Sequence, residues 1–281
     1  MLAAIVILYN PNDSIIENIN SYVDSVRFLY IIDNSDFSNE FFFSQTTFNN
    51  KLKYVFNNRN LGIAKALNIG CSMAISDGMH WVLTMDQDSH FSSRCKETFL
   101  FAINNSDPNV ALYYPSYIIG GLIYDKYIKE DNEPIAVMTS GNLLNLKVYE
   151  KINGFDEKLF IDYVDFEYCL KLKKCGYKIA NLPDLNLVHE LGQSLFWSFF
   201  SFKVMITNHS SLRRYYITRN RLYVRKKYRN ISTAFYNAES RIFINDLLKI
   251  ILFEKHKFSK LMSVFIGFLH YKNNKYGIYQ R

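Results

Sequence analysis

Four short apolar runs, each closed by a polar cluster, constrain the fold of this chain most strongly. They are rich in β-branched and aromatic residues and cover residues 3–8, 28–32, 52–56 and 81–85. Apolar residues recur at helical spacing from Ile15 to Val26, and a small-residue helix is predicted from Ile63 to about Ser76. This order of strands and helices predicts an α/β fold with a mostly parallel, doubly wound central sheet and flanking helices.

Polar side chains follow the ends of these predicted strands. They include Asn10, Asp33 with Asn34, Asn60, and Asp86 to Asp88. In a sheet of this kind the ligand binds beyond the carboxyl ends of the strands, so we expect these residues to meet at one edge. The loop that contains Asn60 also opens a helix, whose first backbone N–H groups can face an anion.

Asp86 and Asp88 form an acidic pair directly after a buried strand. Carboxylates two residues apart can project to the same side and suit a hard divalent cation that also binds diphosphate. Such pairs also occur in solvated turns, but the position at the binding edge favours the metal interpretation. His189 follows an apolar strand-like run, and it is either a buried, hydrogen-bonded histidine or a further metal ligand.

A second acidic group lies among large apolar residues before a helix predicted from Val164 to Cys175. Asp162 and Asp165 are three residues apart, so on a helix they would share a face. A carboxylate in apolar surroundings can have a raised pKa, which suits a general base. For Asp162, capping of the helix N-terminus is the alternative to catalysis. A last short strand is predicted at Lys178–Leu182.

The charge of the chain is divided unevenly along its length. Residues 1–189 carry 16 Lys and Arg against 22 Asp and Glu, a net charge of −6, whereas residues 190–281 carry 17 against 4, a net charge of +13. We therefore predict a catalytic domain at 1–210 and a basic, amphipathic helical extension at 211–281. The extension would contact an anionic membrane surface or a second copy of the chain. Its apolar residues, including Leu247, Ile250, Ile251 and Phe253, would pack on the catalytic domain, lie on lipid, or do both.

Several functional classes lack their sequence signatures. The four cysteines form no C-x-x-C pair, so a structural zinc site is not expected, and their scatter is typical of a reducing cytosol. There is no P-loop, dinucleotide fingerprint or nucleophile elbow. The sequence contains no run of about 18 apolar residues, so no membrane-spanning segment is predicted. The first residues indicate a strand instead of a signal peptide. We expect a cytoplasmic protein, either free or peripheral on the inner face of the cytoplasmic membrane.

Taken together, these motifs resemble the family 2 glycosyltransferases, which have the GT-A fold. The resemblance covers about residues 3–228. It rests on these stretches, in order: Ile5–Asn10, Ile31–Ser35, Asn60–Gly70, Leu83–Ser89, Thr139–Asn142, Gly154–Glu157 and Phe160–Glu167. The segments Asp86–Ser89, Phe160–Asp165, His189–Gly192 and Arg214–Asn220 look like the rhamnosyltransferase branch.

The resemblance implies roles for individual residues. Asp165 matches the family's catalytic base, and Asp86, Asp88 and His189 would hold Mg²⁺ or Mn²⁺. The residues implied in binding the nucleotide sugar are Tyr9, Asn10, Asp33, Asn34, Asn60, Gly62, Lys65, Asp86, Gln87, Ser140 and Gly141. The family inverts the anomeric centre, so one base suffices and no covalent sugar intermediate is needed.

The resemblance also implies the substrates. The donor would be a nucleotide-diphospho-sugar, with dTDP-rhamnose as the first expectation and a UDP-sugar as the alternative. The acceptor would be a saccharide or an undecaprenyl-diphosphate-linked glycan in the synthesis of a bacterial surface polysaccharide such as O-antigen or capsule. The Gln-x-x-Arg-Trp signature of the processive synthases is absent, so transfer of one or a few residues is expected.

Three other functions are weighed against this interpretation. A sugar-1-phosphate nucleotidyltransferase would need a Gly-rich loop after the first strand, and residues 8–14 contain no glycine. A glycoside hydrolase could use Asp162 or Asp165 with Asp86 or Asp88, but it would not need a nucleotide. A nucleic-acid-binding module could use the basic stretch Arg213–Arg229, although the acidic body argues against it and no nucleic-acid partner is expected.

Overall fold

The computed structural model describes residues 1–124, 127–131, 133–189, 195–199, 202–206 and 208–280. Its centre is one large sheet with the strand order β3-β2-β1-β4-β10-β6-β11-β5, and β7 (Leu122–Ile123) pairs with β6. The four strands predicted from the sequence form one half of it: β1 (Leu2–Leu8), β2 (Phe28–Asp33), β3 (Leu52–Phe56) and β4 (Trp81–Asp86). All four are parallel, so their carboxyl ends lie at one edge.

The other half of the sheet is mixed. Strand β10 (Asn142–Asn145) runs antiparallel to both β4 and β6 (Val110–Ile119), and β6 is parallel to β11 (Lys178–His189). Strand β11 continues through a register shift to His189, where it pairs with β5 (Ser89–Phe91). The predicted last strand is therefore longer than expected, and its extension carries His189 beside the end of β4.

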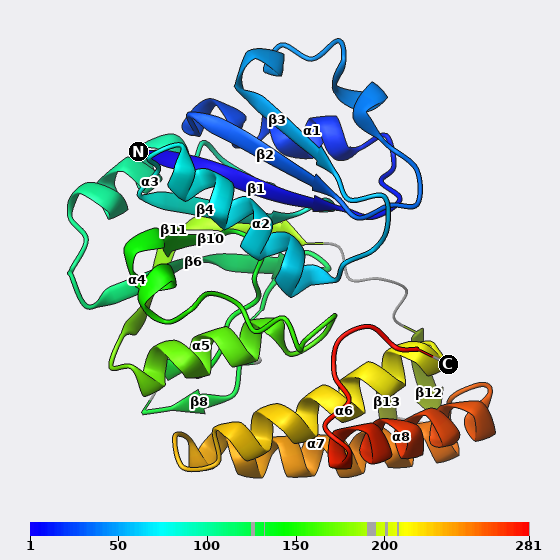
Figure 1. The fold of residues 1–281 in the computed structure, drawn as a ribbon. Helices are drawn as coiled ribbons and strands as arrows, with labels where there is room; N and C mark the ends of the chain where they lie inside the picture. The colour runs from blue at the N-terminus through cyan, green and yellow to red at the C-terminus, as the bar shows by residue number, and fades with distance from the viewer. Residues whose placement is uncertain (125–126, 132, 190–194, 200–201, 207, 281) are drawn as a thin grey trace.

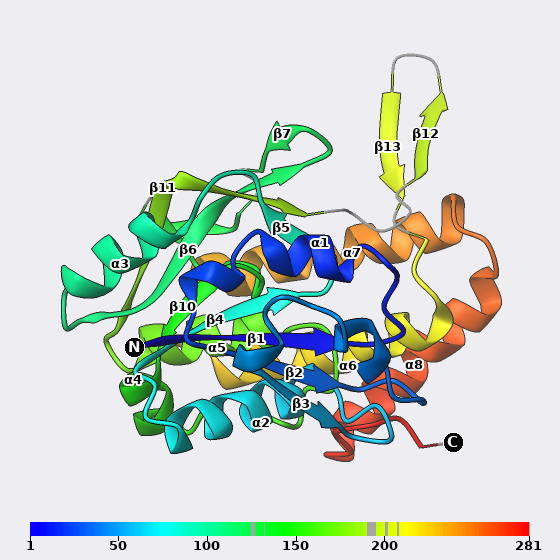
Figure 2. The ribbon, with the colours of Figure 1, turned by 90° about the horizontal axis from the view of Figure 1, so that it is seen from above.

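Helices cover both faces of the parallel half, as expected for strands whose side chains are apolar on both faces. Ala3, Ala4, Ile5 and Val6 of β1 are fully buried, because a parallel strand packs against neighbours on both sides. Figure 2 shows α1 (Ile15–Asn20) and α2 (Ile63–Ser76) on opposite sides of the sheet. Helix α2 matches its predicted range, whereas the first predicted helix divides into α1 and a 3₁₀ turn at Val23–Ser25.

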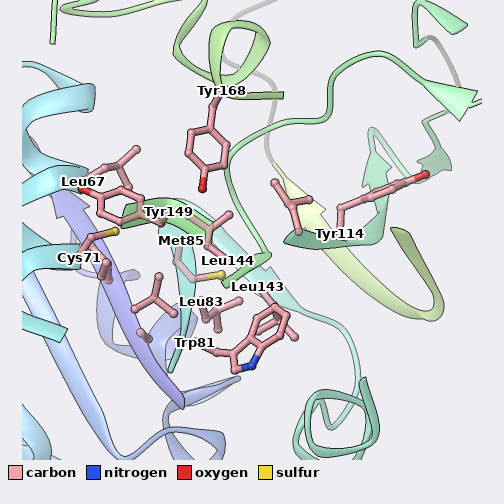
Figure 3. Packing of buried hydrophobic residues seen from close by; sticks show 14 of the residues in the cluster. Leu67, Cys71, Trp81, Leu83, Met85, Tyr114, Leu143, Leu144, Tyr149 and Tyr168 are labelled. Atoms are coloured by element: carbon pink, nitrogen blue, oxygen red, sulfur yellow. The ribbon is translucent and has the colours of Figure 1, made fainter. Parts of the chain in front are cut away.

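The buried core joins the sheet to the helices on its α2 side. Figure 3 shows Leu67 and Cys71 of α2, Met85 of β4, and two tyrosines gathered in one cluster. Tyr149 comes from α4 (Leu146–Lys151), and Tyr168 comes from α5 (Val164–Lys174). The short helix α3 (Lys96–Asn104) follows β5. The packing of Tyr149 and Tyr168 in this cluster fixes the segment between α4 and α5 against the sheet edge.

The described residues between 195 and 280 form a pair of strands and a helical layer. Strands β12 (Leu195–Phe199) and β13 (Phe202–Ile206) pair with each other and project from the body in Figure 2. Figure 1 shows α6 (Ser211–Lys227) between the body and two further helices, α7 (Thr233–Leu252) and α8 (Lys257–Lys272). A separate ribbon is made by β8 (Lys129–Glu130) and β9 (Glu133–Pro134).

The α/β fold predicted from the sequence is confirmed, and one local expectation needs correction. Helix α5 begins at Val164, so Asp162 precedes it and does not share a helical face with Asp165. Asp162 and Tyr163 both have left-handed backbone conformations, with φ of 61° and 67°. Within the residues that the structure describes, no helix is both long and apolar enough to span a membrane.

Candidate functional site

A cavity of about 540 Å³ lies at the carboxyl ends of β1 and β4, where the sequence predicted a ligand. Its walls come from the sheet edge, the loop before α2, the segment before α5 and the start of α6. The lining residues are Ile7, Tyr9, Asn34, Asn60, Gly62, Ile63, Asp86, Gln87, Asp88, Phe160, Ile161, Ser210, Leu212, Arg213 and Tyr216. Seven of the predicted site residues are therefore brought together here.

Tyr9 and Gln87 fasten the ends of β1 and β4 to each other. The backbone N–H of Tyr9 donates to Gln87 Oε1 at 2.9 Å, and Gln87 Nε2 donates to the carbonyl of Tyr9 at 3.2 Å. The polar atoms of the Gln87 side chain are thus engaged with backbone. The half-exposed phenol ring of Tyr9 remains available at the cavity wall.

Asp33 does not line the cavity, and its buried carboxylate instead stabilises the loop that follows β2. Its carboxylate is fully buried and accepts hydrogen bonds from Ser35 N, Asn39 and Tyr54 Oη. Burial alone would raise the pKa of Asp33, but hydrogen bonds from Tyr54, Ser35 and Asn39 outweigh it and hold the pKa below its ordinary value. Asp33 therefore stays ionised and shapes the loop after β2. Asn10 is held to this loop through its backbone N–H, which donates to Ser35 Oγ at 2.8 Å.

Asn34 and Asn60 shape the loop that enters α2. Asn34 Nδ2 donates to the carbonyl of Gly62 at 3.3 Å, and Asn60 Oδ1 accepts from the backbone N–H of Gly62 at 2.9 Å. Gly62 has a φ of +85°, and a Cβ there would lie 2.6 Å from the carbonyl oxygen of Phe160. Only glycine allows the two walls of the cavity to approach this closely.

Lys65 does not line the cavity. It lies on the first turns of α2, and its Nζ is 3.0 Å from Oε1 and 2.9 Å from Oε2 of the exposed Glu157. Asn68 also donates to Glu157. In this structure Lys65 therefore ties α2 to the segment before α5, away from the predicted nucleotide contacts.

Asp86, Asp88 and His189 form a cluster suited to a cation. One ligand atom from each lies within 4.8 Å of the others, and His189 Nδ1 is 3.8 Å from Asp88 Oδ1. The hydroxyl of Ser89 is hydrogen bonded to the same ring nitrogen at 2.8 Å. Burial, and then the charge of Asp88, raise the pKa of Asp86 to about 6, while His189 opposes this. Two carboxylates and an imidazole are a donor set that Mg²⁺ or Mn²⁺ accepts, and a bound cation would relieve the repulsion between the carboxylates.

Ser140 and Gly141 lie directly behind Asp86. The backbone N–H of Asp86 donates to Ser140 Oγ at 3.0 Å, and the N–H of Gly141 donates to the carbonyl of Thr84 at 2.7 Å. Both residues are buried, and neither lines the main cavity. They therefore position the end of β4 and contribute no wall to the cavity.

Asp165 lines a different cavity, of about 210 Å³. Aromatic and aliphatic residues surround its carboxyl group there; the lining comprises Tyr124, Tyr127, Ile128, Ala136, Val137, Met138, Asp165, Phe166 and Ile242. Burial raises the pKa of Asp165 to about 6, and the charges of Asp162 and Asp86 add to the increase, against a hydrogen bond from the N–H of Phe166. Asp86 thus influences Asp165 although the two residues line separate cavities.

Asp162 is paired with the helical layer and does not cap α5. Its Oδ1 accepts from Arg213 Nε at 3.2 Å and from a terminal guanidinium nitrogen at 3.0 Å. Burial raises the pKa of Asp162, and Arg213 partly offsets that increase. Asn220 Nδ2 donates to the carbonyls of Ile161 at 2.7 Å and Asp162 at 3.1 Å. Helix α6 therefore holds the strained turn before α5.

The contribution of α6 to the cavity was not predicted from the sequence. Ser210, Leu212, Arg213 and Tyr216 form part of its wall, and Tyr216 stacks on Phe160 with ring centroids 5.1 Å apart. The only signal was that Arg214–Asn220 belongs to the resemblance, which does not say which way the helix faces. Of the related segment His189–Gly192, residues 190–192 lie outside the described residues.

Comparisons with known proteins identify the family of this chain. The family model described as glycosyl transferase family 2 matches residues 3–157. The dTDP-rhamnosyl transferase RfbF of Shigella flexneri is 28% identical over 246 residues, which cover 80% of this chain and 79% of that protein.

Solved structures share the fold at low identity. S. aureus TarS 1–349 has a TM-score of 0.64 at 15% identity, and its complex with UDP-GlcNAc has 0.60 at 16%; both comparisons cover 96% of this chain and 80% of that one. GalNAc-T7 with UDP, GalNAc and Mn²⁺ has a TM-score of 0.58 at 15% identity and covers 80% of this chain. This chain spans 47% of that protein, about half its length.

Proposed function

This chain belongs to glycosyl transferase family 2, and from that premise we propose that it transfers rhamnose from dTDP-rhamnose to a saccharide or lipid-linked glycan acceptor. The donor proposal is supported by the similarity to the dTDP-rhamnosyl transferase RfbF, which extends over most of both chains. Membership of the family also argues against the nucleotidyltransferase, hydrolase and nucleic-acid-binding alternatives. The proposed setting is the cytoplasmic synthesis of a bacterial surface polysaccharide.

The observation that carries the proposal is the cation cluster at the rim of the cavity. Asp86 and Asp88 line the cavity, and a ring nitrogen of His189 lies within 4.8 Å of a carboxylate oxygen of each. We propose that these three residues hold Mg²⁺ or Mn²⁺. When bound, the cation would supply positive charge for the diphosphate of the donor and of the departing nucleotide. Tyr9, Asn34 and Asn60 would then contact the nucleoside in the rest of the cavity.

We propose Asp165 as the general base. Its carboxylate would take the proton of an acceptor hydroxyl while the hydroxyl oxygen forms the new bond to C1 of the donor sugar. The bond from C1 to the diphosphate oxygen breaks on the opposite face, so the anomeric centre is inverted. A pKa of about 6 suits this role, because the group is ionised at neutral pH yet remains basic enough to accept a proton.

The two cavities suggest how the substrates are divided. The cavity of about 540 Å³ beside Asp86 would take the donor, and the cavity of about 210 Å³ around Asp165 would take the acceptor sugar. Ser140 and Gly141 line neither cavity, but they are hydrogen bonded to the end of β4, which carries Asp86. Tyr124 and Tyr127 give the acceptor cavity aromatic walls, which are suited to stacking on a sugar ring.

Thermal denaturation with dTDP, UDP and GDP, each with and without Mg²⁺ or Mn²⁺, tests the donor site. A ligand that binds only the folded protein raises its stability by RT ln(1 + [L]/Kd). We expect a metal-dependent increase that is largest with dTDP and is lost in Asp88→Ala. The matched control is Asp184→Ala, which removes an exposed carboxylate elsewhere on β11. A folded protein that no nucleotide stabilises would contradict the proposal.

A UDP-sugar donor is the second candidate. It is favoured by one solved structure of the same fold, TarS 1–349, which was determined with UDP-GlcNAc. The largest metal-dependent increase with UDP would keep the enzyme class and replace rhamnose as the donor sugar.

A further inference from the structure

The outer faces of α7 and α8 carry large apolar side chains exposed to solvent. On α7 they recur at helical spacing as Ile244, Leu248, Ile251 and Leu252, and on α8 as Phe258, Met262, Phe265 and Leu269. Phe258 is 80% exposed and Phe265 is 55% exposed. We call these eight residues the outer apolar stripe. Large exposed apolar side chains gathered on one face of each of two neighbouring helices mark a surface that contacts something else.

The opposite faces of the same helices are already occupied by α6. Glu239 pairs with Arg221 at 2.9 Å, and Gly267 of α8 packs on the backbone of α6, where a Cβ would lie 2.8 Å from the carbonyl oxygen of Tyr215. Ile250, on the inner side of α7, is fully buried, whereas Ile251 is exposed. The stripe therefore lies on the faces of α7 and α8 that point away from α6.

The acidic side chains of α7, α8 and the turn between them all form ion pairs within the helical layer. Residues 233–280 contain three, Glu239, Asp246 and Glu254. Glu239 and Asp246 pair with Arg221, and Glu254 pairs with Arg214 and with Lys260. Glu239 and Glu254 are buried. No acid of this segment is left to neutralise charge on the outer face.

The cations around the stripe remain exposed. Arg241 lies on the outer face of α7, Lys255 and Lys257 flank the turn before Phe258, and Lys272 ends α8. The outer surface thus combines apolar side chains with positive charge that no acid of residues 233–280 offsets. This combination is typical of helices that lie in the interface of an anionic bilayer.

We propose that the outer apolar stripe docks on an anionic lipid bilayer, with α7 and α8 parallel to its plane. A second copy of this chain is a poorer occupant, because a two-fold contact through this face would bring the same cations together. A bilayer instead buries the stripe and attracts Arg241, Lys255, Lys257 and Lys272 to its headgroups. The cavity wall formed by α6 would then lie about one helix layer, roughly 10 Å, above the lipid surface.

Vesicle co-sedimentation of the full chain tests this proposal. One set of vesicles is phosphatidylcholine alone, and the other is phosphatidylcholine mixed with phosphatidylglycerol. We expect binding to the anionic vesicles that weakens as salt is added. Phe258→Glu should weaken it at least tenfold, since it removes a large apolar contact and adds a negative charge. The matched control is Phe101→Glu on α3, where the side chain is 71% exposed on another side of the body.

The charge contribution is measured separately. Lys255→Gln with Lys257→Gln should reduce partitioning roughly 25-fold, because each cation near an anionic surface contributes about fivefold. Lys96→Gln with Lys147→Gln removes two exposed cations from α3 and α4 and should leave binding unchanged. All of these positions are at the surface, so circular dichroism should confirm the fold of each variant.

Three outcomes would overturn the proposal. The first is no preference for anionic vesicles over phosphatidylcholine. The second is equal binding by Phe258→Glu and Phe101→Glu. The third is a concentration-dependent dimer that Phe258→Glu dissociates, without vesicle binding, which would assign the stripe to a second copy. The measurement needs no donor or acceptor, so its result is independent of the proposed transfer reaction.

Discussion

The carboxyl group of Asp165 lies where ionisation is unfavourable. Burial raises its pKa to about 6, and nearby Asp162 and Asp86 add to the effect. In the unfolded chain the same group ionises near its ordinary value of about 4. The folded protein therefore bears a cost whenever Asp165 is ionised, and this is the state that the proposed base requires.

Asp165→Asn should abolish transfer and stabilise the protein at neutral pH. The raised pKa means that the folded state holds the proton more tightly, so stability is lost as pH rises from about 4 to about 6. Asparagine does not ionise, so we expect the free energy of unfolding to increase by up to about 3 kcal/mol near pH 7 and by little near pH 4. Urea denaturation at a series of pH values measures this, alongside a transfer assay.

Asp156→Asn is the control with the opposite sign. Burial would raise the pKa of Asp156, but Lys227 and Tyr223 outweigh it and hold the pKa below its ordinary value. This substitution should destabilise the protein at neutral pH, and the difference should shrink on acidification. Destabilisation of similar size by Asp165→Asn at neutral pH would contradict a raised pKa for Asp165 in the folded protein.

Individual site residues were predictable to different degrees. Tyr9, Asn34, Asn60 and Gln87 line the cavity as expected, because the carboxyl end of a parallel strand points its next residues at the ligand edge. Asp33 has the same position in its strand, yet it turns inward, since Asn39 and Tyr54 supply hydrogen bonds that no local pattern shows. Strand ends can be read from sequence, but the direction of a side chain depends on such distant partners.

Helix α6 shows the limit of pattern analysis at the level of an element. Its arginines were assigned to a basic extension that contacts an anionic membrane surface or a second copy of the chain, because charged residues are rarely fully buried without partners. In the structure Arg214, Arg219 and Arg221 are buried. Arg219 donates to the carbonyls of Gly277 at 2.8 Å and Lys158 at 3.4 Å, both about 60 residues away. Because these partners come from distant segments, the periodicity of α6 alone could not reveal its buried face.

Arg221→Met tests whether the buried ion pairs hold α6 and α7 together. Arg221 lies 2.9 Å from Glu239 and 2.8 Å from Asp246, and its side chain is almost fully buried. Removing one partner of a buried pair leaves an uncompensated charge, so we expect a loss of about 3–5 kcal/mol in the free energy of unfolding. Urea denaturation at neutral pH measures the loss, which salt should change little because the pair is buried.

Lys65→Met is the matched control for an ion pair at the surface. The side chains of Lys65 and Glu157 are both nearly half exposed, so the loss should be no more than about 1 kcal/mol. Adding Glu239→Gln to Arg221→Met should recover part of the lost stability, because it removes the buried charge that Arg221 no longer offsets. Asp246 keeps a second cation, since Arg214 lies 3.7 Å from it. Equal losses for Arg221→Met and Lys65→Met would show that the buried pairs do not join the helices.

On the scale of the whole molecule, the predicted boundary between residues 210 and 211 does not coincide with a gap in packing. Tyr228 Oη donates to the buried Glu167 of α5 at 2.7 Å, and Lys227 Nζ lies 2.8 Å from the same carboxylate. Helix α6 also forms one wall of the main cavity. The sequence shows a change in net charge along the chain, but net charge does not indicate which segments pack against each other. We therefore expect the described helical layer and the sheet to unfold as one unit.

Two probes can follow the two parts of the molecule separately. The chain has two tryptophans, and Trp197→Phe leaves Trp81 of β4 as the only one, buried in the sheet. Far-ultraviolet circular dichroism reports mainly on helix, and α6, α7 and α8 are the three longest helices described. In urea, the fluorescence and dichroism transitions should coincide in this background. Adding Arg221→Met should move both midpoints by the same amount, although the substitution lies in the helical layer and the fluorophore lies in the sheet. If the dichroism midpoint moved alone, α6–α8 would be a separate domain, and the cavity wall that α6 provides would be a contact between domains.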